Sequence, residues 1–139
     1  MSNAAPEIGL LLEEDRCFTQ AEFDLFAEIS GDDNPIHVDP VFSGETRFGR
    51  TVAHGMLLYT SLWGLVHRHL PGFKPSLQSL MFPAPTFAGE AMELRAELVE
   101  RQSDRECVFD FSIRRKADEV VTLQGRASLI RGEEDGACN

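Results

Sequence analysis

The chain has 139 residues, enough for one domain whose folding buries roughly two-thirds of the surface exposed by the unfolded chain. Its formal net charge is −10, from 23 acidic and 13 basic residues. This balance argues against nucleic acid as the main partner, because phosphate contacts need clustered Lys and Arg. The three cysteines lie far apart, which indicates neither a disulfide framework nor a CxxC metal site and favours a reducing cytoplasm.

No apolar run approaches the roughly 18 residues of a membrane span. The acidic stretch "PEIGLLLEED" near the start lacks the basic flank of a signal peptide. There is no internal repeat and no low-complexity linker. We therefore expect one domain over residues 1–139, with a core from about residue 14 to about residue 131 and flexible polar ends.

The first predicted helix has a complete N-terminal signature. Thr19 can cap the helix while Glu22 reaches back as the partner in a capping box, and Phe18 with Phe23 fits a hydrophobic staple. The apolar positions that follow recur at helical spacing. We expect this helix to end near Ser30-Gly31.

A second, longer helix is predicted from "AHGMLLYTSLWGLVHRHLPG", residues 53–72. Its apolar residues surround most of the helical circumference, which is typical of a helix buried on several sides. Pro71-Gly72 should end it. Its length, roughly 25 Å at about 1.5 Å per residue, is enough to cross a small sheet.

The second half of the chain has the alternating pattern of β-strands. Apolar residues occupy every second position in residues 92–98, 107–113 and 121–129, and a fourth run at 76–87 is interrupted by Pro83 and Pro85. The pattern predicts an α+β fold, in which an antiparallel sheet with one buried face wraps around the long helix.

Between the two helices lies "SGDDNPIH", Ser30 to His37, with two carboxylates, one carboxamide and one histidine. Asn34-Pro35 is a strong turn signal because proline restricts both its own backbone and that of the preceding residue. Taken alone, the segment is most simply a polar exit from a helix.

The longer stretch "FAEISGDDNPIHVDPVFSGETRFGRTVAHGMLL" resembles the MaoC-like, R-specific enoyl-CoA hydratases of the hot-dog fold. The signature of that family is an Asp, a spaced Asn-Pro and a His, followed by His-Gly-Met at the head of the central helix. The resemblance extends from about Phe18 to Ile130, nearly the whole chain.

The resemblance implies roles for individual residues. Asp32 and His37 match the catalytic pair, and Asp33 occupies a variable position. Asn34 matches the asparagine of the motif and can bond either to its own loop or to the polar arm of the substrate. Gly55 matches the glycine whose backbone N–H polarises the thioester carbonyl. Family membership also implies a homodimer with a shared active site, or a higher oligomer, and a reaction that uses no metal and no cofactor.

The chemistry of hydration explains this set of residues. Adding water to an α,β-unsaturated thioester needs a base for the attacking water, an acid to protonate C2, and a stabilising group for the enolate oxygen. Asp32 and His37 can divide the first two roles, and we assign these roles to the pair jointly. The N–H of Gly55 at a helix start can supply the third.

Five further residues are candidates for binding substrate or shaping its site. His54 is interpreted as fixing the helix start, by analogy with capping. Met56 follows Gly55 in the motif, and Trp63 stands where related hydratases can carry a small polar residue, so it is a candidate for the acyl pocket. Arg47 and Arg50 are either solvated loop charges or contacts for the phosphates of CoA.

The leading hypothesis is (R)-specific, reversible hydration of trans-2-enoyl-CoA. The alternatives are a dehydratase that takes its substrate on acyl carrier protein, a hot-dog acyl-CoA thioesterase, and a non-catalytic subunit that binds acyl thioesters. Acyl thioesters and a second copy of the chain are the expected partners.

Overall fold

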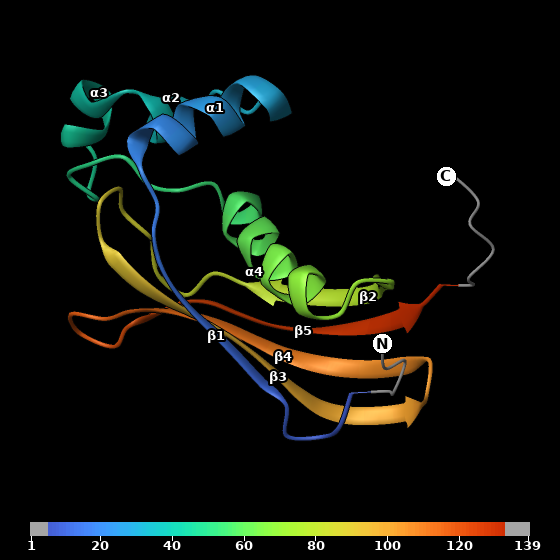
Figure 1. Ribbon diagram of the computed structural model, residues 1–139. Helices are drawn as coiled ribbons and strands as arrows, with labels where there is room; N and C mark the ends of the chain where they lie inside the picture. The colour runs from blue at the N-terminus through green and yellow to red at the C-terminus, as the bar shows by residue number, and fades with distance from the viewer. Residues whose placement is uncertain (1–5, 133–139) are drawn as a thin grey trace.

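In the computed structural model, which describes residues 6–132, a long helix, α4 (Gly55–His69), crosses one face of an antiparallel sheet (Figure 1). Three short helices precede it: α1 (Gln20–Ser30), α2 (Pro35–Val38) and α3 (Pro40–Gly44). The strands are β1 (Leu11–Cys17), β2 (Phe73–Met81), β3 (Ala91–Ser103), β4 (Glu106–Arg115) and β5 (Val121–Arg131). The expected α+β architecture is confirmed.

The five strands lie in the order β1-β3-β4-β5-β2, and every neighbouring pair is antiparallel. Consecutive strands β3, β4 and β5 form the middle of the sheet, so β1 and β2 are its edges. Gly125 of β5 lies opposite Leu80 of β2, and a Cβ at Gly125 would come within 2.7 Å of the backbone oxygen of Ser79. The absence of a side chain therefore permits the close approach of β2.

The core lies between α4 and the sheet. Alternate residues of β3, β4 and β5 point toward the helix, as the period of two requires. Each fully buried Leu or Phe contributes about 1.5–3 kcal/mol. The buried residues of α4 and of the central strand β4 illustrate the two sides of this core: Leu58, Tyr59, Leu62, Leu65, Val66, Cys107, Phe109, Phe111 and Ile113.

The opposite side of α4 is less buried than its sequence predicts. Met56 is 50% exposed, Thr60 and His67 are exposed, and Trp63 is half-buried. The expectation of burial on several sides is wrong for the single chain, because the sheet covers only one side of the helix.

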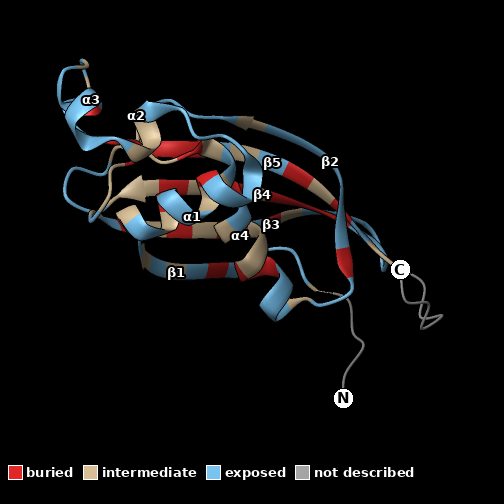
Figure 2. Ribbon diagram, turned by 90° about the horizontal axis from the view of Figure 1, so that it is seen from above, coloured by how far each residue is buried: buried red, intermediate tan, exposed pale blue. Residues whose placement is uncertain are grey.

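The predicted capping box at the start of α1 is confirmed, with Thr19 and Glu22 bonded reciprocally. The helix ends where expected, at Gly31, whose φ of 82° is in the region that favours glycine and whose N–H donates to the Ala27 carbonyl. This turn directs the chain into the SGDDNPIH loop. Helices α1, α2 and α3 together form a layer above the N-terminal end of α4 (Figures 1 and 2).

One feature of the sheet differs from the sequence prediction: strand β1 was not predicted, and its buried Leu12 places the start of the core before residue 14. Strand β2 ends at Met81, and the chain then bends through Pro83 and Pro85, as the two prolines predict. No helix within residues 6–132 is long and apolar enough to cross a membrane. The expected flexibility of residues 1–5 and 133–139 lies outside the described residues.

Candidate active site

The SGDDNPIH loop is held in place by its own polar groups and by the segments around it. The side chain of Asn34 accepts a hydrogen bond from the Ile36 N–H and so caps α2, with Pro35 as the first helical residue. The buried hydroxyl of Ser43 bonds to the Pro35 and Ile36 carbonyls, and Gln20 donates to the His37 carbonyl. The loop is therefore preorganised from both sides.

These contacts place His37 beside Asp32. The Nδ1–H of His37 donates to the Val52 carbonyl at 2.7 Å, which leaves Nε2 to face the carboxylate. His37 Nε2 and Asp32 Oδ2 are 3.8 Å apart, too far for a direct hydrogen bond. Two groups at this separation can both bond to one water molecule, which is the arrangement that shared activation of a nucleophile requires.

His54 occupies the N-cap position of α4, but its side chain makes no capping bond, so the expectation of a capping role is wrong. Its Nε2–H instead donates to the Asp32 backbone carbonyl at 2.9 Å, and its ring stacks on that of His37 with centroids 3.8 Å apart. Burial lowers the pKa of His54, and the nearby His37 lowers it further.

Gly55 is the first residue of α4. The Leu57 and Leu58 N–H groups bond to the His54 carbonyl, whereas the N–H groups of Gly55 and Met56 have no acceptor among the described residues. Free N–H groups at a helix N-terminus stabilise negative charge. A Cβ at Gly55 would lie 2.7 Å from the ring of Phe82. The ring of Phe82 would therefore have to shift to admit a side chain at this position.

A cavity of about 650 Å³ connects these groups. Asp32, His37, His54 and Gly55 line it, and so do Met56 and Arg47. Three residues that the sequence proposed do not line it: Asn34 caps α2, Arg50 lies outside, and Trp63 packs against the core from α4. The proposed role of Trp63 in the acyl pocket remains a prediction.

The two arginines near the cavity differ in what they contact. Arg50 forms an ion pair with Glu90 at 2.9 Å and lies over the ring of Phe87. Arg47 lies over Phe48 and has no carboxylate partner within residues 6–132. Arg47 is therefore the cation at this cavity that is available to an anionic ligand.

Sequence reasoning did not identify several apolar residues of the cavity wall. Phe26 comes from α1, Phe48 comes from the loop before α4, and a further group comes from the segment after β2, from Phe82 to Thr86. The prolines of that segment indicated a bend, but no pattern indicated that the bend faces the SGDDNPIH loop.

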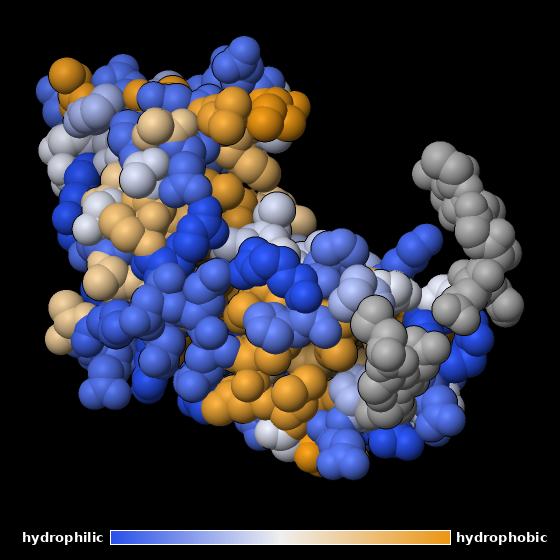
Figure 3. All heavy atoms as spheres, in the orientation of Figure 1, coloured by the Kyte–Doolittle hydropathy of each residue, from blue (hydrophilic) through white to orange (hydrophobic). Residues whose placement is uncertain are grey.

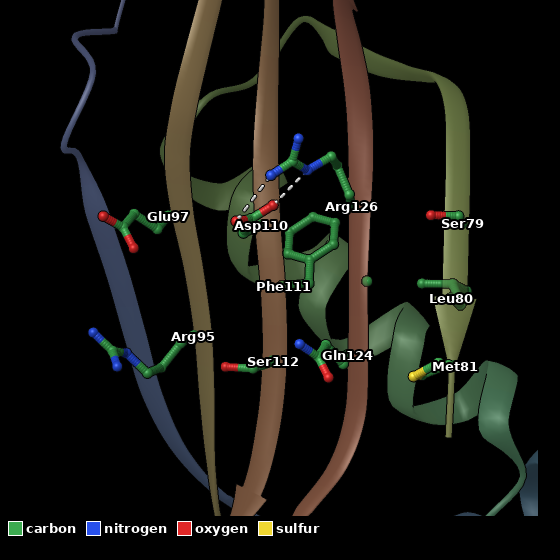
Figure 4. A pocket seen from close by; sticks show the side chains of 11 residues that line it. Ser79, Leu80, Met81, Arg95, Glu97, Asp110, Phe111, Ser112, Gln124 and Arg126 are labelled. Atoms are coloured by element: carbon green, nitrogen blue, oxygen red, sulfur yellow. Dashed lines mark hydrogen bonds and ion pairs between the residues drawn. The ribbon is translucent and has the colours of Figure 1, made fainter. Parts of the chain in front are cut away.

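A second hollow, of about 580 Å³, lies on the opposite face of the sheet (Figure 4). Two of its charged side chains, Asp110 of β4 and Arg126 of β5, form an ion pair at 2.8 Å. No histidine and no helix N-terminus line it. The chemistry needed for proton transfer is found in the first cavity.

Asp32, His37 and His54 each offer a potential metal ligand, with the three atoms within 4.8 Å of one another. However, the two imidazole planes are stacked at 22° to each other. The lone pair of a ring nitrogen lies in the plane of its ring, so two stacked rings cannot both direct lone pairs at one ion at about 2.0–2.1 Å. The cluster fits proton transfer better than metal binding.

Comparison with known proteins gives a consistent result. The sequence matches the family described as the MaoC like domain over residues 2–119. It is 38% identical to the (R)-specific enoyl-CoA hydratase of Aeromonas caviae over 96% of each chain. It is 30% identical to a mitochondrial 3-hydroxyacyl-[acyl-carrier-protein] dehydratase of Arabidopsis thaliana, over 89% of this chain and 76% of that protein.

Solved structures of related proteins agree with the sequence comparison. The (R)-hydratase from A. caviae superposes with a TM-score of 0.85 and 31% identity, covering 91% of this chain and 98% of that one. An R-hydratase from Pseudomonas aeruginosa also gives a TM-score of 0.85, at 27% identity, covering 93% of this chain and 84% of that one. The fold is thus the hot-dog fold. The chain belongs to the MaoC-like family, whose relatives named here are hydro-lyases, and the identification made from the sequence motifs is confirmed.

The packing of Phe82 on Gly55 leads to a testable prediction. We expect Gly55→Ala to lower the free energy of unfolding by about 1–3 kcal/mol, because the new methyl group overlaps the ring. The double variant Gly55→Ala, Phe82→Leu should recover most of this loss. Urea denaturation of both variants, with Phe82→Leu as control, measures the effect. Equal stability of Gly55→Ala and wild type would show that the ring moves aside without cost.

Proposed function

We propose that this protein hydrates trans-2-enoyl-CoA to (R)-3-hydroxyacyl-CoA, and catalyses the reverse dehydration. The observation that carries the proposal is the 3.8 Å separation of Asp32 Oδ2 and His37 Nε2 in a cavity that also contains the N-terminus of α4. A volume of about 650 Å³ is within the range of small-molecule sites.

In the proposed mechanism, Asp32 and His37 hold one water molecule between them. As the water oxygen attacks C3, the pair takes a proton from the water and delivers a proton to C2, so that the new C3–O and C2–H bonds form on the same face of the substrate. The N–H of Gly55 stabilises the negative charge that develops on the thioester oxygen, and the dipole of α4 adds to this effect. The R configuration is supported by the relatives whose names specify it.

The two carboxylates of the loop provide a matched pair for testing the mechanism. Asp32→Asn and His37→Ala should each lower kcat/KM for crotonyl-CoA by about 10²–10⁴-fold, because each removes one proton-transfer group. Asp33 is exposed and does not line the cavity. Asp33→Asn should therefore stay within about twofold of wild type, since the change alters only an exposed charge.

The assay follows loss of the enoyl absorbance, with folding checked by circular dichroism. Release of free thiol from a saturated acyl-CoA is measured in parallel, because this product would indicate a thioesterase. A wild-type protein with neither activity would favour a non-catalytic thioester-binding subunit. Equal hydration by all variants would reject the Asp32–His37 site.

Arg47 is the proposed contact for a phosphate group of CoA. We expect Arg47→Gln to raise KM for crotonyl-CoA by about threefold to tenfold with little change in kcat, because a partly exposed phosphate contact contributes modestly. Arg101→Gln, near the far end of β3, is the control. Rates with crotonyl groups on CoA and on acyl carrier protein are compared side by side. A strong preference for carrier protein, like that in the name of the A. thaliana relative, would contradict this proposal.

We also infer that two copies associate through β2. This edge strand exposes Leu77 at 73%, and the exposed Phe82 follows it beside the cavity. In the upper layer, Ile29 of α1 is 74% exposed, and Figure 3 shows apolar atoms there above a hollow over α4. Unprotected apolar edges are typical pairing surfaces. A partner at β2 would cover the mouth of the cavity.

Sedimentation equilibrium tests this association. We expect the wild type at twice the mass of the 15.5 kDa chain. Leu77 is the middle residue of β2, so in a symmetric antiparallel pairing centred there it lies opposite its own copy. Leu77→Lys should therefore produce monomers, whereas Leu11→Lys on the other edge strand should not. A monomeric wild type would exclude the arrangement.

A further inference from the structure

His54 connects the parts of the site. Its Nε2–H donates to the backbone carbonyl of Asp32 at 2.9 Å, and its ring stacks on His37 at 3.8 Å between centroids. Its own backbone begins α4 directly before Gly55. One side chain therefore contacts both members of the proposed proton-transfer pair and is covalently joined to the proposed oxyanion donor.

The imidazole of His54 is held firmly. It is only 2% exposed, and Phe26 of α1 contacts it with ring centroids 4.8 Å apart. Contacts therefore reach it from α1, from α2 through His37, and from the loop through Asp32. In comparison, the carboxylate of Asp32 is 56% exposed and has few contacts of its own. The Asn34 N–H donates to this carboxylate at 3.5 Å, the Asp32 N–H donates to Ser30, and His54 supplies the third bond, to the Asp32 carbonyl.

The geometry also favours one protonation state of His54. Because Nε2–H donates to a carbonyl, the neutral ring carries its proton there and leaves Nδ1 without one. Nδ1 is buried and has no hydrogen-bond partner within residues 6–132. A second proton, at Nδ1, would create a buried donor with no acceptor and a buried positive charge next to the His37 ring, both of which are unfavourable. The lowered pKa of His54 agrees with this reasoning.

We propose that His54 is a positioning residue, which fixes the Asp32 backbone through its Nε2–H and the plane of the His37 ring through stacking, and exchanges no proton with the substrate. The proposal rests on the proposed hydratase function. It separates two adjacent histidine roles in the site: His37 gains and loses a proton during each turnover, and His54 keeps one tautomer throughout.

Three substitutions separate the two contacts. Gln keeps a donor near the position of Nε2 but removes the ring, Phe keeps a ring but removes the donor, and Met removes both at similar size. We expect His54→Gln to keep kcat for crotonyl-CoA within about fivefold of wild type, and His54→Phe and His54→Met to fall about tenfold or more below Gln. KM should change by less than about threefold, because the proposed action of His54 is through Asp32 and His37 and not through substrate binding.

Thermal unfolding and nitrogen-15 NMR of the four histidines provide readouts beyond activity. We expect the His54→Gln and His54→Met variants to unfold at similar temperatures. In the wild type, we expect His54 to carry its proton on Nε2 throughout pH 6–8. Equal kcat of Gln and Met, or a proton on Nδ1 in that range, would overturn the proposal. Failure of the hydratase function is distinguishable, because wild type would then be inactive while the NMR tautomer would still report the geometry.

Discussion

The packing of α4 against one face of the sheet is the contact on which the rest of the structure depends. Leu58, Leu62 and Val66 on the helix meet the alternating apolar residues of β3, β4 and β5, and this burial fixes both the direction and the depth of the helix. Its N-terminus is thereby held beneath the layer formed by α1, α2 and α3. No side chain caps the N-terminus of α4, so this end gains no stability from capping. The burial of the later turns of α4 against the sheet keeps the helix formed up to that end.

The same constraint explains which polar groups are paired. The ring nitrogens of His37 and His54 that face backbone carbonyls are both bonded, to Val52 and to Asp32. His37 Nε2 has no hydrogen bond and faces only the Asp32 carboxylate at 3.8 Å, and the first N–H groups of α4 have no acceptor among the described residues. Polar groups without partners are costly, so their presence along one cavity wall marks a place where a ligand completes the bonding.

Local signals in the sequence predicted much of this arrangement. The capping box at Thr19, the stop at Gly31 and the alternation in the last three strands depend on neighbouring residues, and all three features are present. Strand β1 was missed because Leu12 is its one buried residue and acidic residues dominate the rest. The stacking of His37 on His54, the ring of Phe82 over Gly55 and the bond from His54 to Asp32 join segments that only the tertiary fold brings together. No spacing in the chain encodes them.

The cavity wall is built from two separate stretches of chain. Asp32, His37 and Gly55 belong to one continuous stretch, whereas the segment from Phe82 to Thr86 forms the facing wall and joins the first through a single backbone bond from Ala53 to Thr86 and the bridge between Val52 and Phe87. The residues with proposed chemical roles and the residues that shape the facing wall therefore lie in separate segments of the sequence. Side chains of the second stretch can be exchanged to fit acyl groups of other sizes while the hydrogen bonds that orient the proposed proton-transfer pair stay in place, so the fit to a substrate can change without rebuilding the proposed reactive centre.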